Sequence, residues 1–230
     1  MNTDSSLVFG SSGFIGFKVI NLLNENKISV LAPSRSPQTN LPKNTKEIVI
    51  ENFDLTSIEI SDVKHAYICL GTKLRAWELI RMNKTKKDEF QKVDLEIILN
   101  AARKARSCGA ETISLISAVG VKAESFNFYM SIKGRVEKEI IALGFKSVNI
   151  FRPGHLMGKG TDSNWDVKFA DFVSKIIDNF MIGPFSKFKS IEGNSVAKSM
   201  VIETQKSKSG VNYFYFNDMI QSLTMDTPST

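Results

Sequence analysis

The amino-acid sequence is poor in cysteine and histidine, with two of each in 230 residues. Cys69 and Cys108 are too few for a disulfide framework or a four-cysteine zinc site, so we expect no metal centre. No apolar run approaches the roughly 20 residues that span a bilayer, and residues 1–6 lack the basic-then-apolar layout of a secretion signal. These absences favour a soluble protein in a reducing compartment, and we expect a cytoplasmic location and no membrane span.

The charge is unbalanced but dispersed. Hydrophobic residues make up 42% and charged residues 23%, which excludes global disorder. The net charge is +6, yet only residues 81–92 are locally dense in lysine and arginine, and this stretch also contains Asp88 and Glu89. A solvated helix start explains the stretch better than a phosphate-backbone patch. We therefore do not expect a nucleic-acid partner, and the purpose of the stretch stays open.

Short apolar β-rich runs alternate with segments of helical spacing, a pattern typical of a parallel sheet covered on both faces. We expect a doubly wound α/β Rossmann fold with three layers. The expected strands are residues 7–10, 28–32, 47–50, 66–70, 112–116, 147–151 and 211–216. The expected helices are residues 14–23, 88–105, 128–143, 165–180 and 196–205. We expect one NAD(P)-binding domain over 1–220, with substrate-side elements from about 154–217, and a loose tail at 221–230.

Three glycines follow the first expected strand with the spacing GxxGxxG. Gly10 permits a tight turn, and Gly13 lets a pyrophosphate approach the start of a helix, where free N–H groups and the helix dipole favour anions. Gly16 lets the helix pack closely on the sheet. The strand before the loop and the helix after it favour a dinucleotide site over a plain structural turn. The predicted cofactor loop comprises Gly10, Ser11, Ser12, Gly13, Phe14, Ile15 and Gly16.

The end of the second expected strand favours NADP(H) over NAD(H). NAD-specific sites place an Asp or Glu about 20 residues into the motif, where it holds the ribose 2′-hydroxyl. This chain has no acidic residue between Asn26 and Lys46. Ser34 and Arg35 follow the strand instead, and an arginine there suits a 2′-phosphate. A solvated loop arginine is the alternative.

Together with later motifs, this loop resembles the atypical branch of the short-chain dehydrogenase/reductases, and within it the Tat-interacting-protein-like NADP-binding oxidoreductases. The resemblance runs from about Ser6 to about Val201. Its carriers are the glycine loop, Arg35, Asp54-Leu55, CLGT at 69–72, LIS at 115–117, YMSIKGRVE at 129–137, FRPG at 151–154 and SIEGNSVAKSM at 190–200.

The resemblance implies a catalytic pair, Tyr129 and Lys133, which lie four apart and therefore on one helix face. The lysine would lower the pKa of the tyrosine and hold the nicotinamide ribose, and the tyrosine would act as general acid. Ser117 would orient the same carbonyl oxygen. Conventional members add a relay asparagine, and the sequence assigns that role to neither Asp94 nor Asn100. Besides Tyr129 and Lys133, the implied cofactor contacts are Asp54, Leu55, Leu70, Gly71, Thr72, Arg152, Pro153 and Gly154.

These residues favour an NADP(H)-dependent oxidoreductase that reduces a small carbonyl or quinone-like compound. The alternative is an NADPH-binding regulator or sensor with little turnover and a protein partner. A sugar-nucleotide epimerase uses the same tyrosine and lysine but normally needs a larger C-terminal substrate domain. Aromatic side chains slightly favour an apolar carbonyl substrate, although core packing explains them equally well: Phe126, Phe128, Phe169, Phe172, Phe185 and Phe188.

Overall fold

Seven parallel strands form the central sheet of the structure, a computed structural model that describes residues 5–50, 54–55, 59–72, 74, 82–158 and 183–225. The strand order is β3-β2-β1-β4-β5-β6-β9, and every neighbouring pair is parallel. The strands are β1 (Ser5–Phe9), β2 (Val30–Ser34), β3 (Thr45–Val49), β4 (Val63–Ile68), β5 (Thr112–Ile116), β6 (Ser147–Phe151) and β9 (Gly210–Phe214). Two short strands, β7 (Leu156–Met157) and β8 (Ile191–Glu192), pair separately.

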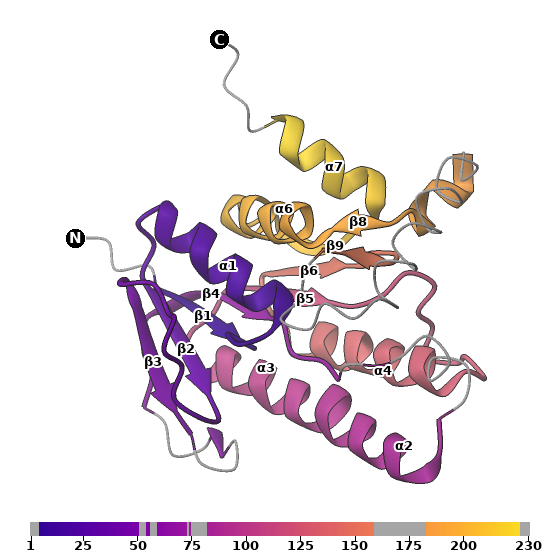
Figure 1. Cartoon of the computed structure of the whole chain (residues 1–230), viewed down its shortest axis with the longest axis horizontal. Helices are drawn as coiled ribbons and strands as arrows, with labels where there is room; N and C mark the ends of the chain where they lie inside the picture. The colour runs from indigo at the N-terminus through magenta and orange to yellow at the C-terminus, as the bar shows by residue number, and fades with distance from the viewer. Residues whose placement is uncertain are drawn as a thin grey trace.

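Helices cover both faces of this sheet (Figure 1). One layer contains α1 (Phe14–Glu25), α6 (Gly193–Lys206) and α7 (Phe216–Met225). The other contains α4 (Phe128–Ala142) and one long helical run, made of α2 (Lys84–Gln91), the π-helix η3 (Lys92–Ile97) and α3 (Ile98–Ser107). Two buried apolar clusters, one per layer, fill the space between helices and sheet. The predicted three-layer Rossmann fold is confirmed.

The strand order changes direction between β1 and β4. The chain adds β2 and β3 on one side of β1 and then crosses back to place β4 on the other side. Strands β2 and β3 lie on one side of β1, whereas β4, β5, β6 and β9 lie on the other. In such sheets the crevice outside the carboxyl ends of the two central strands is the usual ligand site. The segments that follow β1 and β4 are therefore the place to look for function.

Most predicted elements are present with shifted ends, and two expectations are wrong. The long helix starts four residues early, at Lys84, because the Asn83 side chain caps it by accepting a hydrogen bond from the Lys86 N–H (2.8 Å). Residues 221–225 are not a loose tail but the last turns of α7, which is anchored by buried Met219 and Ser222. The predicted helix at 165–180 lies outside the described residues.

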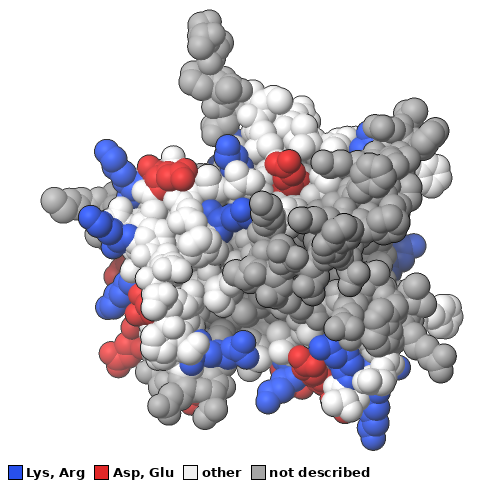
Figure 2. Space-filling model, viewed as in Figure 1, with Lys and Arg blue, Asp and Glu red and all other residues white. Residues whose placement is uncertain are grey.

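On the face drawn in Figure 2, basic and acidic side chains of the described residues are mixed along the left and lower edges. Within the described ranges, no helix is long and apolar enough to cross a membrane.

Candidate functional site: a dinucleotide cleft beside a buried lysine

The glycine loop makes the turn from β1 into α1. Gly10 has a φ of +90°, a conformation that L side chains rarely adopt, and a Cβ there would lie 2.6 Å from the Cys69 carbonyl oxygen. The Gly13 N–H donates to the Gly10 carbonyl (2.9 Å), and a Cβ on Gly16 would overlap that same carbonyl oxygen. The absence of side chains lets the loop lie against the end of β4 and keeps the amino end of α1 open to an anion.

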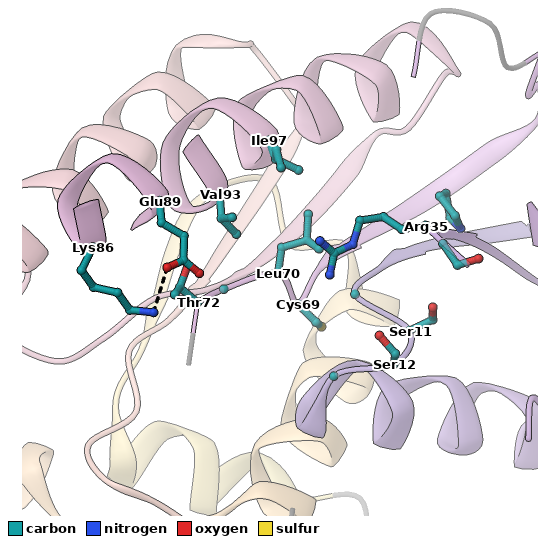
Figure 3. Close-up of a pocket in the computed structure, with 15 residues that line it drawn as sticks. Ser11, Ser12, Arg35, Cys69, Leu70, Thr72, Lys86, Glu89, Val93 and Ile97 are labelled. Carbon is teal, nitrogen blue, oxygen red and sulfur yellow. Dashed lines mark hydrogen bonds and ion pairs between the residues drawn. The ribbon is translucent and has the colours of Figure 1, made fainter. Parts of the chain in front are cut away.

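The loop borders a cleft of about 370 Å³ at the carboxyl ends of β1, β2 and β4 (Figure 3). Of the residues predicted to bind the cofactor, this cleft brings together Gly10, Ser11, Ser12, Gly13, Arg35, Leu70, Gly71 and Thr72. Val93 and Ile97 form an apolar wall on the long helix. Cys69 also lines the cleft, but burial raises the pKa of its thiol to about 12, so it is not a thiolate at neutral pH.

Other predicted cofactor residues do not line the cleft. Ile15 and Leu55 are buried in the core, and Phe14 packs over Gly193 of α6. Pro153 accepts a hydrogen bond from the Val119 N–H (3.0 Å). Gly16, Gly154 and Asp54 also do not line the cleft. Gly154 packs against the backbone of residues 188–189, and Asp54 is exposed.

Among the described residues, the phenylalanines considered for an apolar substrate pocket differ in their exposure. Phe128 packs on the core, Phe126 is fully exposed and Phe185 is 66% exposed. Phe169 and Phe172 lie outside the described residues.

An acidic side chain reaches the end of β2 although none is nearby in the sequence. Glu47 on β3 accepts hydrogen bonds from the Ser34 hydroxyl (2.7 Å) and from the Gln38 N–H (3.1 Å). The Gln38 side chain then donates to Ser11 in the glycine loop (2.6 Å). The loop that carries Arg35 is thus tied to the glycine loop. Glu47 was missed because strand pairing, not sequence distance, brings it there.

The basic stretch at 81–92 also contributes to the cleft. Lys86 and Glu89 of α2 line it and pair with each other (2.9 Å) across from the glycine loop (Figure 3). Part of the unexplained positive charge therefore lies at the same site.

The predicted catalytic pair lies on α4. Lys133 is 7% exposed and its ammonium lies 2.7 Å from the carboxylate of Asp94, which is 1% exposed. The second Asp94 oxygen accepts a hydrogen bond from the Thr72 N–H (2.7 Å). A Cβ on Gly71 would lie 3.9 Å from the lysine ammonium. The lysine ammonium therefore lies close to Gly71, which lines the cleft.

The lysine does not lower the pKa of Tyr129 overall. The ring packs beside Phe90 (5.4 Å between centroids). Burial raises the pKa of the phenol, Lys133 lowers it, and Asp94 raises it again, so the net direction is upward. Lys133 thus lowers the pKa of Tyr129 as the resemblance implies, but burial, which is the largest cause, and Asp94 together outweigh it.

Ser117 and Arg152 meet at a second buried carboxylate. The Ser117 hydroxyl donates to Glu137, and the Arg152 guanidinium donates to both oxygens of the same group, with 3.0 Å for the Nε contact. Arg152 also donates to the Tyr215 hydroxyl (2.9 Å). Glu137 lies one turn beyond Lys133 on α4, a spacing that in hindsight continues the i, i+4 series.

Breaking this buried pair should destabilise the fold. Arg152→Met leaves the Glu137 carboxylate without its cation, and we expect a loss of about 3 kcal/mol in the free energy of unfolding, measured by chemical denaturation. The control is Lys146→Met, which breaks an exposed pair with Glu111 (3.3 Å) and should cost under about 1 kcal/mol. Equal effects of the two substitutions would contradict this assignment.

Similar curated proteins cover most of the chain. Protein FMP52 from Debaryomyces hansenii is 30% identical over 201 residues, covering 86% of each chain. FMP52 from Candida albicans is 26% identical over 215 residues, covering 90% of each. Rat Protein HTATIP2 is 25% identical over 169 residues, covering 68% of this chain and 64% of the relative, in agreement with the resemblance found in the sequence.

Solved structures share the fold. MoeE5 in complex with UDP-glucose and NAD superposes with a TM-score of 0.66 at 17% identity, covering 96% of this chain and 82% of the other. Human epimerase family protein SDR39U1 with NADPH gives 0.62 at 18% identity, covering 92% and 74%.

The comparisons correct the expected location. The FMP52 relatives are named mitochondrial proteins, so the prediction of a cytoplasmic protein is wrong. Composition does not distinguish these two compartments.

One family model matches more than half of the chain. Its description is NAD dependent epimerase/dehydratase family, and it covers residues 6–127, the part that contains the glycine loop and the cleft. The Rossmann fold and the glycine turn before the amino end of α1 agree with this family match. The chain therefore belongs to the NAD-dependent epimerase/dehydratase family, whose architecture is that of the short-chain dehydrogenase/reductases.

Proposed function

We propose that this protein is an NADP(H)-dependent reductase of a small carbonyl or quinone-like compound. The observation that carries the proposal is the position of Lys133 and Tyr129, one turn apart on α4, with the lysine ammonium just behind Gly71 of the dinucleotide cleft. A bound dinucleotide would supply the hydride. The relatives are named mitochondrial, and we propose the same compartment for this chain.

Different residues of the cleft suit different parts of the dinucleotide. The amino end of α1 and the glycine loop suit the pyrophosphate, since N–H groups and the helix dipole favour an anion there. Arg35, at the far end of the cleft beside Leu70 (Figure 3), suits a 2′-phosphate. Lys133 would hold the nicotinamide ribose.

Tyr129 suits the reductive direction because it is protonated at neutral pH. A general acid must carry its proton at the working pH, and a phenol with an ordinary pKa of about 10 already does so. Burial raises the pKa of Tyr129 and makes it a weaker acid, and the charge of Lys133 opposes that effect. Tyr129 would donate that proton to the developing alkoxide. Ser117, which donates to Glu137 in this structure, would turn its hydroxyl to the same oxygen.

Calorimetry tests the cofactor preference. We expect wild-type protein to bind NADPH at least about tenfold more tightly than NADH, and Arg35→Asp to remove or invert that ratio by placing a carboxylate where the 2′-phosphate would lie. Arg135→Asp makes the same charge change on the exposed face of α4 and should leave the ratio unchanged. Equal wild-type affinities would exclude the 2′-phosphate assignment, and Glu47 would then be the candidate ribose ligand.

A second function, a cofactor-bound sensor with little turnover, is favoured by one observation. Ser117 is engaged by a buried carboxylate instead of standing free for a substrate. The sensor predicts tight NADPH binding, no oxidation of NADPH across a panel of aldehydes, ketones and quinones, and a protein partner that is captured in only one redox state of the cofactor. Turnover with any member of the panel favours the reductase.

A further inference from the structure

The π-helix in the long helical run carries a buried acid that the sequence left without a role. Asp94 lies in η3 (Lys92–Ile97) and is 1% exposed. A carboxylate is costly to bury unless it is paired and hydrogen-bonded. Here each oxygen has its own partner, the Lys133 ammonium at 2.7 Å and the Thr72 N–H at 2.7 Å.

These two partners belong to different parts of the site. Thr72 and Gly71 line the dinucleotide cleft, in the segment after β4. Lys133 lies on α4, which packs against η3. A Cβ on Gly71 would lie 3.5 Å from Asp94 and 3.9 Å from Lys133, so this segment rests on the ion pair. One carboxylate thus joins the cleft wall to the lysine.

The local backbone suits this placement. A π turn is a single wide turn inserted in a helix, and such turns occur frequently at functional sites. The turn includes Val93 and Ile97, which line the cleft, as well as Asp94, which is directed away from solvent. The same turn therefore supplies the apolar cleft wall and the buried acid.

We propose that Asp94 is a positioning residue that ties Lys133 to the Gly71–Thr72 segment, so that lysine placement and cofactor binding depend on one side chain. The proposal rests on the proposed function of Tyr129 and Lys133. The carboxylate has two roles in this proposal. One oxygen accepts a hydrogen bond from the Thr72 N–H and holds the Gly71–Thr72 segment, and the negative charge positions and balances the Lys133 ammonium.

Among the described residues, three titratable side chains act on the Lys133 ammonium. Tyr129 and Glu137 face it from α4, Asp94 faces it from η3, and Glu137 is itself held by Arg152. Asp94 makes the direct contact. Removing its charge leaves the lysine less countered, which lowers the pKa of the Tyr129 phenol.

Two substitutions separate the duties. Asp94→Asn keeps an oxygen that accepts from the Thr72 N–H but removes the charge, whereas Asp94→Ala removes both. Asp88→Asn, on an exposed position of α2, is the matched control. The measurements are spectrophotometric titration of the phenol without cofactor, taken as the difference from Tyr129→Phe, and NADPH affinity by calorimetry.

With Asp94→Asn, the pKa of Tyr129 should fall, and NADPH affinity should stay within about threefold. With Asp94→Ala, the pKa should fall likewise and NADPH affinity should weaken at least about tenfold. Asp88→Asn should change neither. An unchanged or higher tyrosine pKa in Asp94→Asn, or wild-type NADPH affinity in Asp94→Ala, would overturn the proposal. Because the titration needs neither substrate nor turnover, its result does not depend on whether the protein reduces carbonyl compounds.

A stability measurement keeps the proposal testable if Asp94→Asn folds poorly. That variant leaves Lys133 buried without its acid, and Lys133→Met removes the unpaired charge. The double variant should therefore have a higher melting temperature than Asp94→Asn alone. A double variant less stable than both single variants would mean that the two side chains do not act as a pair.

Discussion

Phenylalanine at position 129 is expected to lower the rate of NADPH-dependent carbonyl reduction at least about a hundredfold, because the variant keeps the ring but loses the hydroxyl of the proposed general acid. The ring contact with Phe90 is preserved, so folding should be unaffected. The measurement is steady-state oxidation of NADPH with the best substrate of the carbonyl panel.

Tyr213→Phe is the matched control for this experiment. It removes a hydroxyl from a tyrosine on β9 and retains the ring over which the Arg152 guanidinium lies. We expect wild-type turnover from it. Equal turnover by wild type and Tyr129→Phe would show that Tyr129 is not the acid.

A single methyl group on Gly10 is expected to weaken NADPH binding at least about tenfold. Alanine at a φ of +90° costs about 1–3 kcal/mol in backbone strain, and its Cβ would also lie 2.6 Å from the Cys69 carbonyl oxygen. The loop would have to move away from β4, and with it the N–H groups at the start of α1 that receive the pyrophosphate. Calorimetric titration with NADPH measures the loss.

Gly144→Ala separates the backbone cost from the clash. Gly144 ends α4 with a φ of +72°, and a Cβ there meets nothing within 4 Å. Both variants should lose stability from the left-handed backbone, whereas only Gly10→Ala should lose cofactor affinity. If Gly10→Ala binds NADPH as tightly as Gly144→Ala, the glycine loop is not the pyrophosphate site.

The sequence was most informative where one short segment carries the whole signal. The glycine loop makes its turn and its helix start from seven consecutive residues, and the i, i+4 spacing placed Tyr129 and Lys133 on one helix face. Gly71 and Thr72 also lie in the predicted cleft. The glycine turn and the helical spacing depend on local geometry, which a single sequence contains, whereas Gly71 and Thr72 were implied by the family resemblance.

Predictions failed where the partner comes from another element. Glu47 reaches Ser34 through parallel strand pairing, and Asp94 meets Lys133 through packing of two helices. Nothing in the spacing of these residues indicates that they touch. The net direction of the Tyr129 pKa could likewise not be predicted, since it depends on burial and on Asp94 as well as on Lys133, and burial and the Asp94 contact are properties of the folded chain.

The most direct measurement is a crystal structure of the protein with NADPH. We predict the pyrophosphate at Gly10–Gly13, the 2′-phosphate on the Arg35 guanidinium, and the nicotinamide ribose within hydrogen-bond distance of the Lys133 ammonium and the Tyr129 hydroxyl. A dinucleotide bound elsewhere, or one whose nicotinamide lies away from Tyr129 and Lys133, would contradict the account.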